Sequence, residues 1–405
     1  MNAEAQPLPQ PWFDHDSPRE ITDTPTSFAL PGGSAELFAR TTDVDPKLWA
    51  AAFGDQPKDF EYYRLIEDTM TEGYSYRYLV LRDARGRVAA LQPLLIADQD
   101  LTASSGDFIG RAAAAIRRFA PRFLRSRMLM AGCLVGDAMI GVVPGADATE
   151  AVRLLADALV QLAKQERISL ITVKDFPATE RAVLAPLVEA NYCRLASFPP
   201  MKLALNFESF DEYLEKRLSK VTRKGLRRKL RKTTDTPLEL EVTDDCREVI
   251  DEIYPLYLAV AEKSDVSFEV FTKAYFVEAS RRMSERFRFF IWRHAGKAVA
   301  FSFCTVTRDA IYDNDIGLDY AVAHDLNLYY VTFRDLIQWA LAHGFREYHS
   351  APFNYDPKLH LRLEPVAVDI YVRHKSPLIN RVLQRFAPHF APAKSDPALR
   401  RYLRL

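Results

Sequence analysis

A weak internal repeat constrains the fold of this chain more than any other feature of its sequence. Residues 76–96 and 287–306 each alternate apolar and polar residues on both sides of a short turn that contains a glycine, Gly86 or Gly296. This pattern predicts two β-hairpins, with glycine at a turn position that favours positive φ. A pattern that occurs twice in 405 residues predicts two related domains, each long enough to bury its own core.

The same order of elements follows each hairpin. Apolar residues with helical spacing predict a helix over residues 149–165 in the first half and over 329–343 in the second. A short apolar strand is predicted after each helix, at 169–173 and 346–350. The hairpin glycines are 210 residues apart and the helices 177, so the first half has 33 additional residues (210 − 177), near 98–130.

The inserted segment is basic and amphipathic over residues 108–127. A segment of this kind can lie on an anionic membrane surface, bind a partner or cover an active site, and a helical flap packed on its own domain is the alternative. The two ends of the chain are rich in proline. We expect a disordered tail at 1–30 and a C-terminal tail at 389–405.

The net charge of zero conceals an uneven distribution of charge. The chain has 54 basic and 54 acidic residues, but a predicted helix at 211–232 carries ten basic and no acidic residues between 216 and 232. The rest of the chain therefore has 44 basic residues (54 − 10) against 54 acidic ones. A surface this cationic can bind phosphates through ion pairs, and the alternative is a solvated helix face.

The four cysteines are scattered, with no CxxC pair and no histidine at metal-ligand spacing. Neither a disulfide framework nor a metal site is predicted, and a reducing compartment is favoured. The chain has no stretch of about 20 apolar residues, and its N-terminus lacks the pattern of a signal peptide. We therefore expect a cytoplasmic protein.

The basic segment 218–232, the second hairpin with its helix, and the sequence from Gly344 to Lys358 resemble the double-domain branch of the GNAT acyltransferase superfamily. That branch includes the Fem-type aminoacyltransferases of cell-wall peptide synthesis and related bacterial GNAT-family N-acetyltransferases. The resemblance covers most of residues 37–388 and is most specific in the second half. It implies an α/β (α+β) fold with tandem GNAT-like domains, each a mixed, mostly antiparallel sheet flanked by helices.

The resemblance also implies a division of labour and an activity. It assigns 31–207 to an N-terminal GNAT-like domain and 208–388 to a C-terminal catalytic domain that includes the basic helix. The implied activity is transfer of an acyl or aminoacyl group from a thioester or ester donor to an amine acceptor, which attacks directly. The implied co-substrate is acetyl-CoA or another acyl-CoA, and a donor carried on an acidic carrier protein or on tRNA is also open.

In ordinary GNAT enzymes, the loop before the helix that corresponds to 329–343 holds a pyrophosphate through backbone N–H groups. Here Asn327 can adopt the left-handed conformation of a glycine, whereas Tyr329 is bulky where close approach of a phosphate is expected. This departure leaves open a carrier-protein or tRNA donor that docks partly through the basic helix. The candidate donor-binding residues are His324, Asn327, Lys358, Arg223, Arg227 and Arg228.

Acyl transfer to an amine requires a base, a polarised donor carbonyl and a proton source for the leaving group. A strand predicted at 310–320 alternates so that Asp313, Asp315 and Gly317 share one face. We predict Asp313 or Asp315 as the base or as the anchor of the acceptor ammonium, with an edge-exposed or hydrogen-bonded structural pair as the alternative. His349 is a second base candidate, and Tyr355 is the candidate proton donor.

Two other classes of protein remain open at this point. A non-catalytic double-GNAT adaptor would keep the fold without the chemistry. A nucleic-acid-binding protein would use the basic helix, although that helix has no interleaved aromatic residues and the chain has no recognisable nucleic-acid module.

Overall fold

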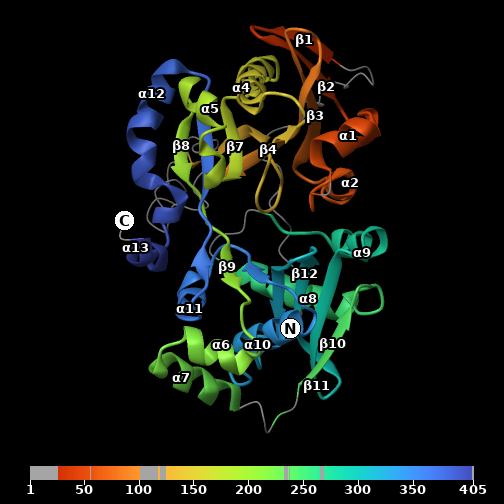
Figure 1. Ribbon diagram of the computed structural model, residues 1–405, viewed down its shortest axis with the longest axis vertical. Helices are drawn as coiled ribbons and strands as arrows, with labels where there is room; N and C mark the ends of the chain where they lie inside the picture. The colour runs from red at the N-terminus through yellow and green to blue at the C-terminus, as the bar shows by residue number, and fades with distance from the viewer. Residues whose placement is uncertain are drawn as a thin grey trace. The chain divides into compact units, whose positions relative to one another are not determined.

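The computed structural model describes residues 26–54, 56–100, 117–118, 125–231, 236, 238–264 and 269–403, which divide into two compact units. The first unit comprises the described residues up to Ser197 together with Val368–Ser395, and the second comprises Phe198–Ala367 with the described residues from Asp396 onward. Each unit is built on one mixed sheet with helices on its faces, as Figure 1 shows, so the predicted α/β class with two related halves is confirmed.

The sheet of the first unit has the strand order β1-β2-β3-β4-β5-β7-β16-β8, with β6 paired to β4. Neighbouring strands are antiparallel, except that β5 and β7 are parallel. The strands are β1 (Thr26–Leu30), β2 (Gly33–Phe38), β3 (Tyr74–Asp83), β4 (Val88–Asp100), β5 (Arg125–Ala131), β6 (Gly141–Val142), β7 (Leu170–Pro177), β8 (Cys193–Ala196) and β16 (Val368–His374).

Helix α4 packs on one face of this sheet. It begins after Asp147, whose carboxylate accepts hydrogen bonds from the backbone N–H groups of Thr149 and Glu150. Its apolar face, which includes Leu155, Leu159 and Leu162, lies in the core with residues of β3, β4, β5 and β7. The other helices are α1 (Pro46–Phe53), α2 (Phe60–Thr69), α4 (Ala148–Gln165), α5 (Ala185–Glu189) and α12 (Pro377–Phe386), with short 3-10 turns η1 (Thr41–Asp43), η2 (Ala178–Arg181), η3 (Ala387–Phe390) and η4 (Pro392–Lys394).

The sheet of the second unit has the order β10-β11-β12-β13-β14-β9-β15, in which only the β13–β14 pair of the described strands is parallel. Its strands are β9 (Met201–Ala204), β10 (Glu239–Thr243), β11 (Phe287–His294), β12 (Lys297–Val306), β13 (Ala310–Leu318), β14 (Glu347–Ser350) and β15 (Glu364–Pro365). Its helices are α6 (Phe210–Arg217), α7 (Lys220–Arg231), α8 (Ile250–Lys263), α9 (Lys273–Arg282), α10 (Leu328–Ala342), α11 (Tyr355–His360) and α13 (Pro397–Leu403).

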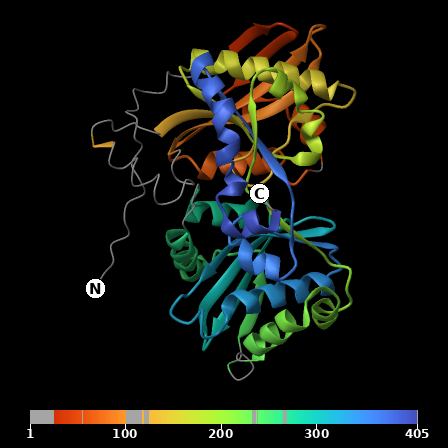
Figure 2. The same ribbon diagram turned by 90° about the vertical axis from the view of Figure 1, so that its left-hand side faces the viewer.

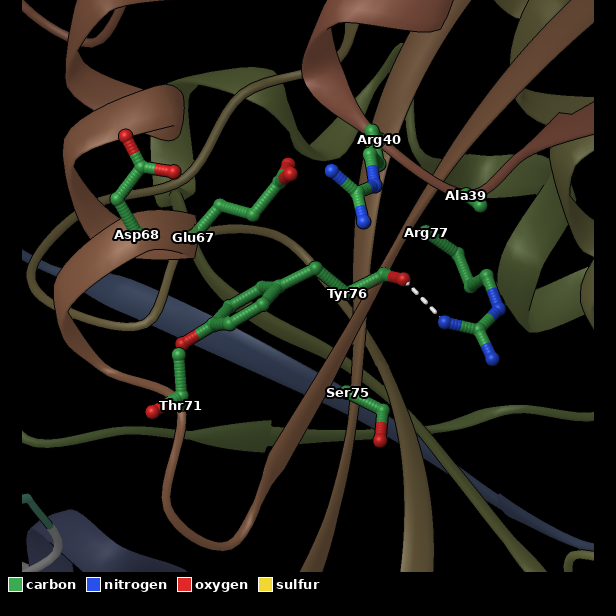
Figure 3. A pocket seen from close by; sticks show the side chains of 8 residues that line it. All are labelled: Ala39, Arg40, Glu67, Asp68, Thr71, Ser75, Tyr76 and Arg77. Atoms are coloured by element: carbon green, nitrogen blue, oxygen red, sulfur yellow. Dashed lines mark hydrogen bonds between the residues drawn. The ribbon is translucent and has the colours of Figure 1, made fainter. Parts of the chain in front are cut away.

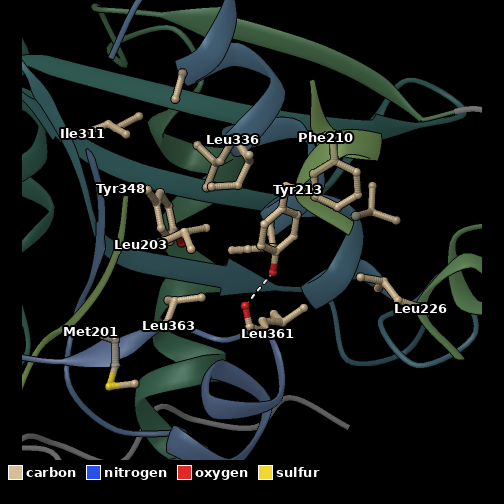
Figure 4. Packing of buried hydrophobic residues seen from close by; sticks show 14 of the residues in the cluster. Met201, Leu203, Phe210, Tyr213, Leu226, Ile311, Leu336, Tyr348, Leu361 and Leu363 are labelled. Carbon is tan, nitrogen blue, oxygen red and sulfur yellow. Dashed lines mark hydrogen bonds between the residues drawn. The ribbon is translucent and has the colours of Figure 1, made fainter. Parts of the chain in front are cut away.

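The core of the second unit lies between its sheet and helices α6, α7 and α10, which Figure 2 shows along one side of the strands. Figure 4 shows Tyr213 of α6 beside Leu336 of α10, with the Tyr213 hydroxyl donating a hydrogen bond to the backbone oxygen of Leu361 at 2.6 Å. Helix α8 packs on β12 and β13 from the opposite face. The second sheet is therefore covered on both faces.

The predicted repeat is present in both sheets: each has a hairpin, a third antiparallel strand, a helix and a parallel fourth strand. The two halves also exchange one strand. β9, from the end of the first half of the sequence, pairs with β14, whereas β16, from the end of the second half, lies between β7 and β8. The division into units therefore differs from the linear boundaries predicted at 207/208 and 388/389.

Two expectations about the ends of the chain are corrected. Residues 26–30 of the predicted tail form β1, and residues 397–403 form α13, because Ala398 and Leu399 bury apolar side chains in the core of the second unit. Much of the predicted insertion at 98–130 lies outside the described residues, but its two ends pair in the β4–β5 ladder.

Gly317 marks a close approach between β13 and α8. A Cβ atom there would stand 2.2 Å from Phe301 Cε1 and 2.8 Å from the backbone carbon of Leu256. We therefore expect Gly317→Ala to lower the free energy of unfolding by about 1–3 kcal/mol, because the core would have to shift around the added methyl group. Urea denaturation measures this change.

Gly225→Ala is the matched control for that substitution. Beyond the adjacent residues and the backbone of helix α7 itself, no atom of the described residues lies within 4 Å of the Cβ position at Gly225. Alanine there should raise stability by about 0.5–1 kcal/mol through helix propensity. Equal effects of the two substitutions would contradict the packing argument.

Candidate active site

The candidate site lies where strands β13 and β14 stop pairing. Their parallel ladder covers only Ala310–Asp313 on β13 and ends opposite Ser350, with one further hydrogen bond at 3.1 Å from the Ala351 N–H to the backbone oxygen of Asp313. β13 continues to Leu318, paired on its other side with β12. The later part of β13 therefore has an edge outside the β14 ladder, where an extended ligand can hydrogen-bond to the backbone.

A β-bulge at the same point separates the two candidate carboxyls. Cys304 of β12 lies opposite Asp313, and the adjacent Phe303 lies opposite Asp315, so Asn314 is the extra residue. The amide of Asn314 donates to the Thr305 hydroxyl at 2.7 Å. Asp313 and Asp315 consequently point to opposite faces of the sheet, and the prediction that they share a face was wrong.

Asp313 belongs to a hydrogen-bonded group on the α10 face. Its carboxylate accepts a hydrogen bond from the Tyr348 hydroxyl at 2.7 Å, and the Cys304 Sγ lies 3.9 Å from its other oxygen. Burial raises the pKa of Asp313, while the Tyr348 hydrogen bond and the charge of Lys358 act in the opposite direction. Asp313 is therefore held by specific partners, which was the structural alternative considered for it.

Lys358 is buried on the same side of the site. Its Nζ donates to the backbone oxygen of Ala351 at 2.6 Å, which ties α11 to the turn that follows β14. Burial lowers the pKa of Lys358 to about 8, against the opposing charge of Asp313. With a relative exposure of 7%, this lysine is placed inside the unit and not on its surface.

Asp315 lies on the α8 face, in a different environment. Burial raises its pKa to about 7, and the charges of Asp313 and Glu269 act in the same direction. The charge of Asp315 in turn contributes to the raised pKa of the Tyr257 phenol, after burial of that ring. A carboxyl that titrates near neutral pH can accept a proton from an ammonium group under ordinary conditions.

His349 and Tyr355 lie on β14 and at the start of α11. His349 stacks on Tyr312 with ring centroids 4.4 Å apart, and its Nε2 lies 2.9 Å from a carboxylate oxygen of Glu347. Glu347 also pairs with Lys202 at 2.6 Å, and these contacts lower the pKa of Glu347. Tyr355 begins α11 and is buried in the core of the second unit. The roles predicted for His349 and Tyr355 remain predictions.

The loop before α10 has the backbone expected of a ligand-binding turn. Asn327, the residue before the helix, is left-handed with φ 48° and ψ 39°, as the sequence predicted. His324 is exposed, and its backbone oxygen accepts a hydrogen bond from the Asn327 N–H at 3.2 Å. Tyr329 packs against the core, and burial followed by the charge of Asp313 raises its pKa. Its side chain is therefore directed into the unit.

The predicted basic helix is two helices, α6 and α7. The break falls at Leu218, which is extended with φ −98° and ψ 143°, and Ser219 begins the second helix by accepting a hydrogen bond from the Thr222 N–H. Leu226 is buried as predicted, but Val221 is 83% exposed and lies outside the apolar stripe. Most of the predicted cationic residues thus lie on a helix separate from α6.

Acidic residues of α6 neutralise part of the positive charge of α7. Arg227 lies 3.4 Å from both Asp211 and Glu215 of α6, and Arg223 donates to the backbone oxygen of Glu215. Six basic residues of α7 have no acidic partner at ion-pair distance in the described part of the chain, and four of them share one face: Lys220, Lys224, Arg228 and Arg231. Their charge is available to an external anion.

Helix α7 lies against the beginning of α10. The Nζ of Lys229 stands 3.7 Å from the centre of the Tyr330 ring, in the first turn of α10. Lys229 therefore brings one positive charge of α7 to the first turn of α10.

A separate cavity of about 430 Å³ opens in the first unit and is shown in Figure 3. Both signs of charge line it, with Arg40 on one side and Glu67 and Asp68 on α2. Glu67 is already engaged, because it accepts hydrogen bonds from the Thr41 N–H at 2.9 Å and the Tyr78 hydroxyl at 2.7 Å. The sequence pattern did not predict this cavity.

Sequence reasoning also missed three side chains near the carboxyls: Cys304, Tyr348 and Tyr257. Tyr348 and Cys304 lie on strands that were predicted, and the ladders of those strands with β13 bring both side chains to Asp313. The strand registers would have identified them. No local pattern connects α8 to Asp315, so Tyr257 had no comparable signal.

Residues 220–358 match the family described as acetyltransferase (GNAT) domain. Two solved structures resemble the chain with a TM-score of 0.50: the C-terminal domain of a protein described as a lysylphosphatidylglycerol synthetase from Agrobacterium fabrum, and FemX. The first is 12% identical over 86% of this chain and 96% of that chain, and FemX is 11% identical over 85% and 96%. No curated protein sequence shows significant similarity.

The second unit therefore contains a GNAT domain, the domain type of acyltransferases. The chain as a whole is similar in fold to these two structures. Within the described residues, no helix has the length and apolar character needed to cross a membrane, and no three side chains are grouped as ligands for a metal ion.

The raised pKa of Asp315 predicts a pH-dependent contribution to stability. Its folded-state pKa of about 7 lies above the ordinary value of 3.8, so between these values the unfolded chain releases a proton that the folded protein retains. The contribution of this carboxyl is thus fully present below pH 3.8 and is lost as the pH rises to about 7. Asp315→Asn should remove that loss, as measured by urea denaturation across this pH range.

Asp319→Asn is the control, with the opposite sign. Asp319 pairs with Lys297 at 3.0 Å, and this contact lowers its pKa. Its substitution should lower stability at neutral pH. If Asp315→Asn lowered stability in the same way, the carboxyl would be charged and paired in the folded protein.

Proposed function

We propose that this chain is an N-acyltransferase that moves an acyl or aminoacyl group from a thioester or ester donor to an amine acceptor. The donor is acyl-CoA, acyl-carrier protein or aminoacyl-tRNA, and the acceptor attacks it directly. The GNAT domain at 220–358 supports the class of reaction. The observation that carries the proposal is a carboxyl with a pKa of about 7, Asp315, beside the part of β13 that has left the β14 ladder.

In the proposed reaction, Asp313 and Asp315, which lie on opposite faces of the sheet, have different roles. The acceptor ammonium gives a proton to Asp315, and the free amine forms the new C–N bond at the donor carbonyl. The exposed edge of β13 offers backbone N–H groups to the developing oxyanion. The C–S or C–O bond then breaks, and the leaving group takes a proton from Tyr355, the proposed donor. The attacking nitrogen loses its second proton, which returns to Tyr355, so that an amide and a free thiol or hydroxyl are formed. Asp313 holds Tyr348 and acts as a positioning residue.

Donor binding is proposed at the start of α10. Asn327 provides the left-handed turn, and the unpaired cations of α7 attract the phosphates of CoA, of a carrier-protein prosthetic group or of tRNA. The pairing of Arg227 with α6 makes Arg228 the stronger donor contact of the two. A peripheral membrane contact through 108–127 remains a separate proposal, since most of that segment lies outside the described residues.

Substitution of the proposed base should reduce transfer. With acetyl-CoA, acyl-carrier protein and aminoacyl-tRNA each supplied with a panel of labelled amines, Asp315→Asn should lower kcat by about 100-fold or more. Asp319→Asn, on the same strand end but ion-paired with Lys297, should leave kcat unchanged. The kcat of the wild type should rise with pH through about 7 and then level off.

Failure of transfer from every donor would reject the enzyme and favour a non-catalytic adaptor. Salt-sensitive binding of RNA or DNA, unchanged by Asp315→Asn in a protein without transferase activity, would favour the nucleic-acid-binding alternative.

Charge removal on α7 should affect donor binding and not chemistry. We expect Arg228→Ala to raise the KM for the preferred donor roughly five- to tenfold without changing kcat, because an exposed phosphate contact is lost in both ground and transition states. Arg227→Ala, whose guanidinium is shared with two acids, should have a smaller effect. Steady-state kinetics at low and high salt measures both, and equal effects would show that the pairing does not matter.

A further inference from the structure

Helix α12 of the first unit exposes the side chains that a surface helix normally buries. Leu378 is 70% exposed, Ile379 49%, Val382 52% and Phe386 53%. At 100° per residue these four occupy one continuous stripe, because they are spaced by one, four and eight positions from Leu378. A contiguous apolar stripe on a folded protein marks a surface that contacts something apolar.

Polar contacts fix this orientation. The side-chain oxygen of Asn380, the buried residue of α12, accepts a hydrogen bond from the His374 N–H at 2.9 Å, and its amide donates to the backbone oxygen of Asn191 at 2.9 Å. Gln384, one turn later, donates to the same oxygen at 3.1 Å. The polar side of the helix thus faces the protein, and rotating the apolar stripe inward would break three hydrogen bonds. Figure 1 shows α12 along the surface of the first unit.

The charge around the stripe has one sign. Residues 370–395 contain five lysines and arginines and no aspartate or glutamate. Arg381 and Arg385 are exposed and lie beside the stripe on the side away from Asn380. Neither has an acidic partner within ion-pair distance among the described residues. An apolar stripe with a cationic border complements a surface that is apolar inside and anionic at its rim.

We propose that α12 docks the first unit on the surface of an anionic lipid bilayer. The stripe enters the boundary between headgroups and acyl chains, and Arg381 and Arg385 contact lipid phosphates. A second copy of the chain fits less well, because a two-fold pairing of α12 would bring these unpaired arginines against their own equivalents. The ten residues of α12 lie along the bilayer and do not cross it. The proposal rests on α12 alone and is independent of acyl transfer.

Vesicle binding by the full chain tests this proposal. The wild type should co-sediment with phosphatidylglycerol–phosphatidylcholine vesicles and bind pure phosphatidylcholine vesicles much more weakly. The double substitution Leu378→Ser with Phe386→Ser should weaken binding to the anionic vesicles by roughly tenfold or more. Because both side chains are exposed, thermal unfolding should be unchanged. Val221→Ser is the matched control, since Val221 is equally apolar and 83% exposed but lies on the cationic helix α7.

Site-specific fluorescence distinguishes insertion from charge attraction. All four native cysteines are buried, so an environment-sensitive probe can be attached at Ile379→Cys or, as the control, at Val221→Cys. The probe at 379 should shift to shorter wavelength on anionic vesicles, and the probe at 221 should not.

Three results would overturn the proposal. The first is undiminished vesicle binding by the Leu378→Ser and Phe386→Ser variant, or no shift at position 379. The second is a wild-type dimer in sedimentation that this variant dissociates, which would make a second copy the occupant. The third is a probe at 379 that is shielded without vesicles and becomes exposed when residues 1–25 are deleted, which would assign the stripe to the chain's own N-terminal segment.

Discussion

The early end of the parallel ladder between β13 and β14 is the constraint on which the candidate site depends. If pairing continued past Asp313 and Ser350, the edge of β13 would be occupied by backbone hydrogen bonds of the sheet itself. Helix α10 connects the two strands along the chain, and it packs on the sheet face that carries Asp313. The start of that helix therefore lies close to the point where the strands separate. One departure from regular pairing thus supplies an open strand edge beside a helix N-terminus.

The bulge at Asn314 adds a second departure, and it gives the two carboxyls different environments. On one face Asp313 has a tyrosine hydroxyl, a thiol and the charge of a buried lysine around it, so its ionised form is compensated. On the other face Asp315 has burial and two further acids, with no compensating cation among the causes of its shift. The same residue type therefore becomes a structural acceptor at one position and a titrating group at the other.

The sequence predicted elements whose pattern is local, and it failed where structure depends on partners distant in the chain. Both hairpins, α4, α10 and the left-handed Asn327 follow from periodicity and residue type. The bulge could not be read from strict alternation, because it is defined by the register against β12. The break at Leu218 lies within one long basic pattern, where the N-capping residue Ser219 was the local signal that a second helix begins. Helix α13 has a basic, proline-containing sequence, and its stability comes from the burial of Ala398 and Leu399.

The exchanged strands show why the two halves of the sequence are not independent folding units. The first sheet needs β16 between β7 and β8, and the second needs β9 between β14 and β15. A fragment that ends before residue 208 would keep β9 without its neighbours and would lose β16, leaving β7 and β8 separated at the edge of an incomplete sheet. Unpaired strand edges favour aggregation. Because β16 is one of the last strands made, the first sheet can be completed only after almost the whole chain is available, even though its core helix α4 precedes it by about 200 residues.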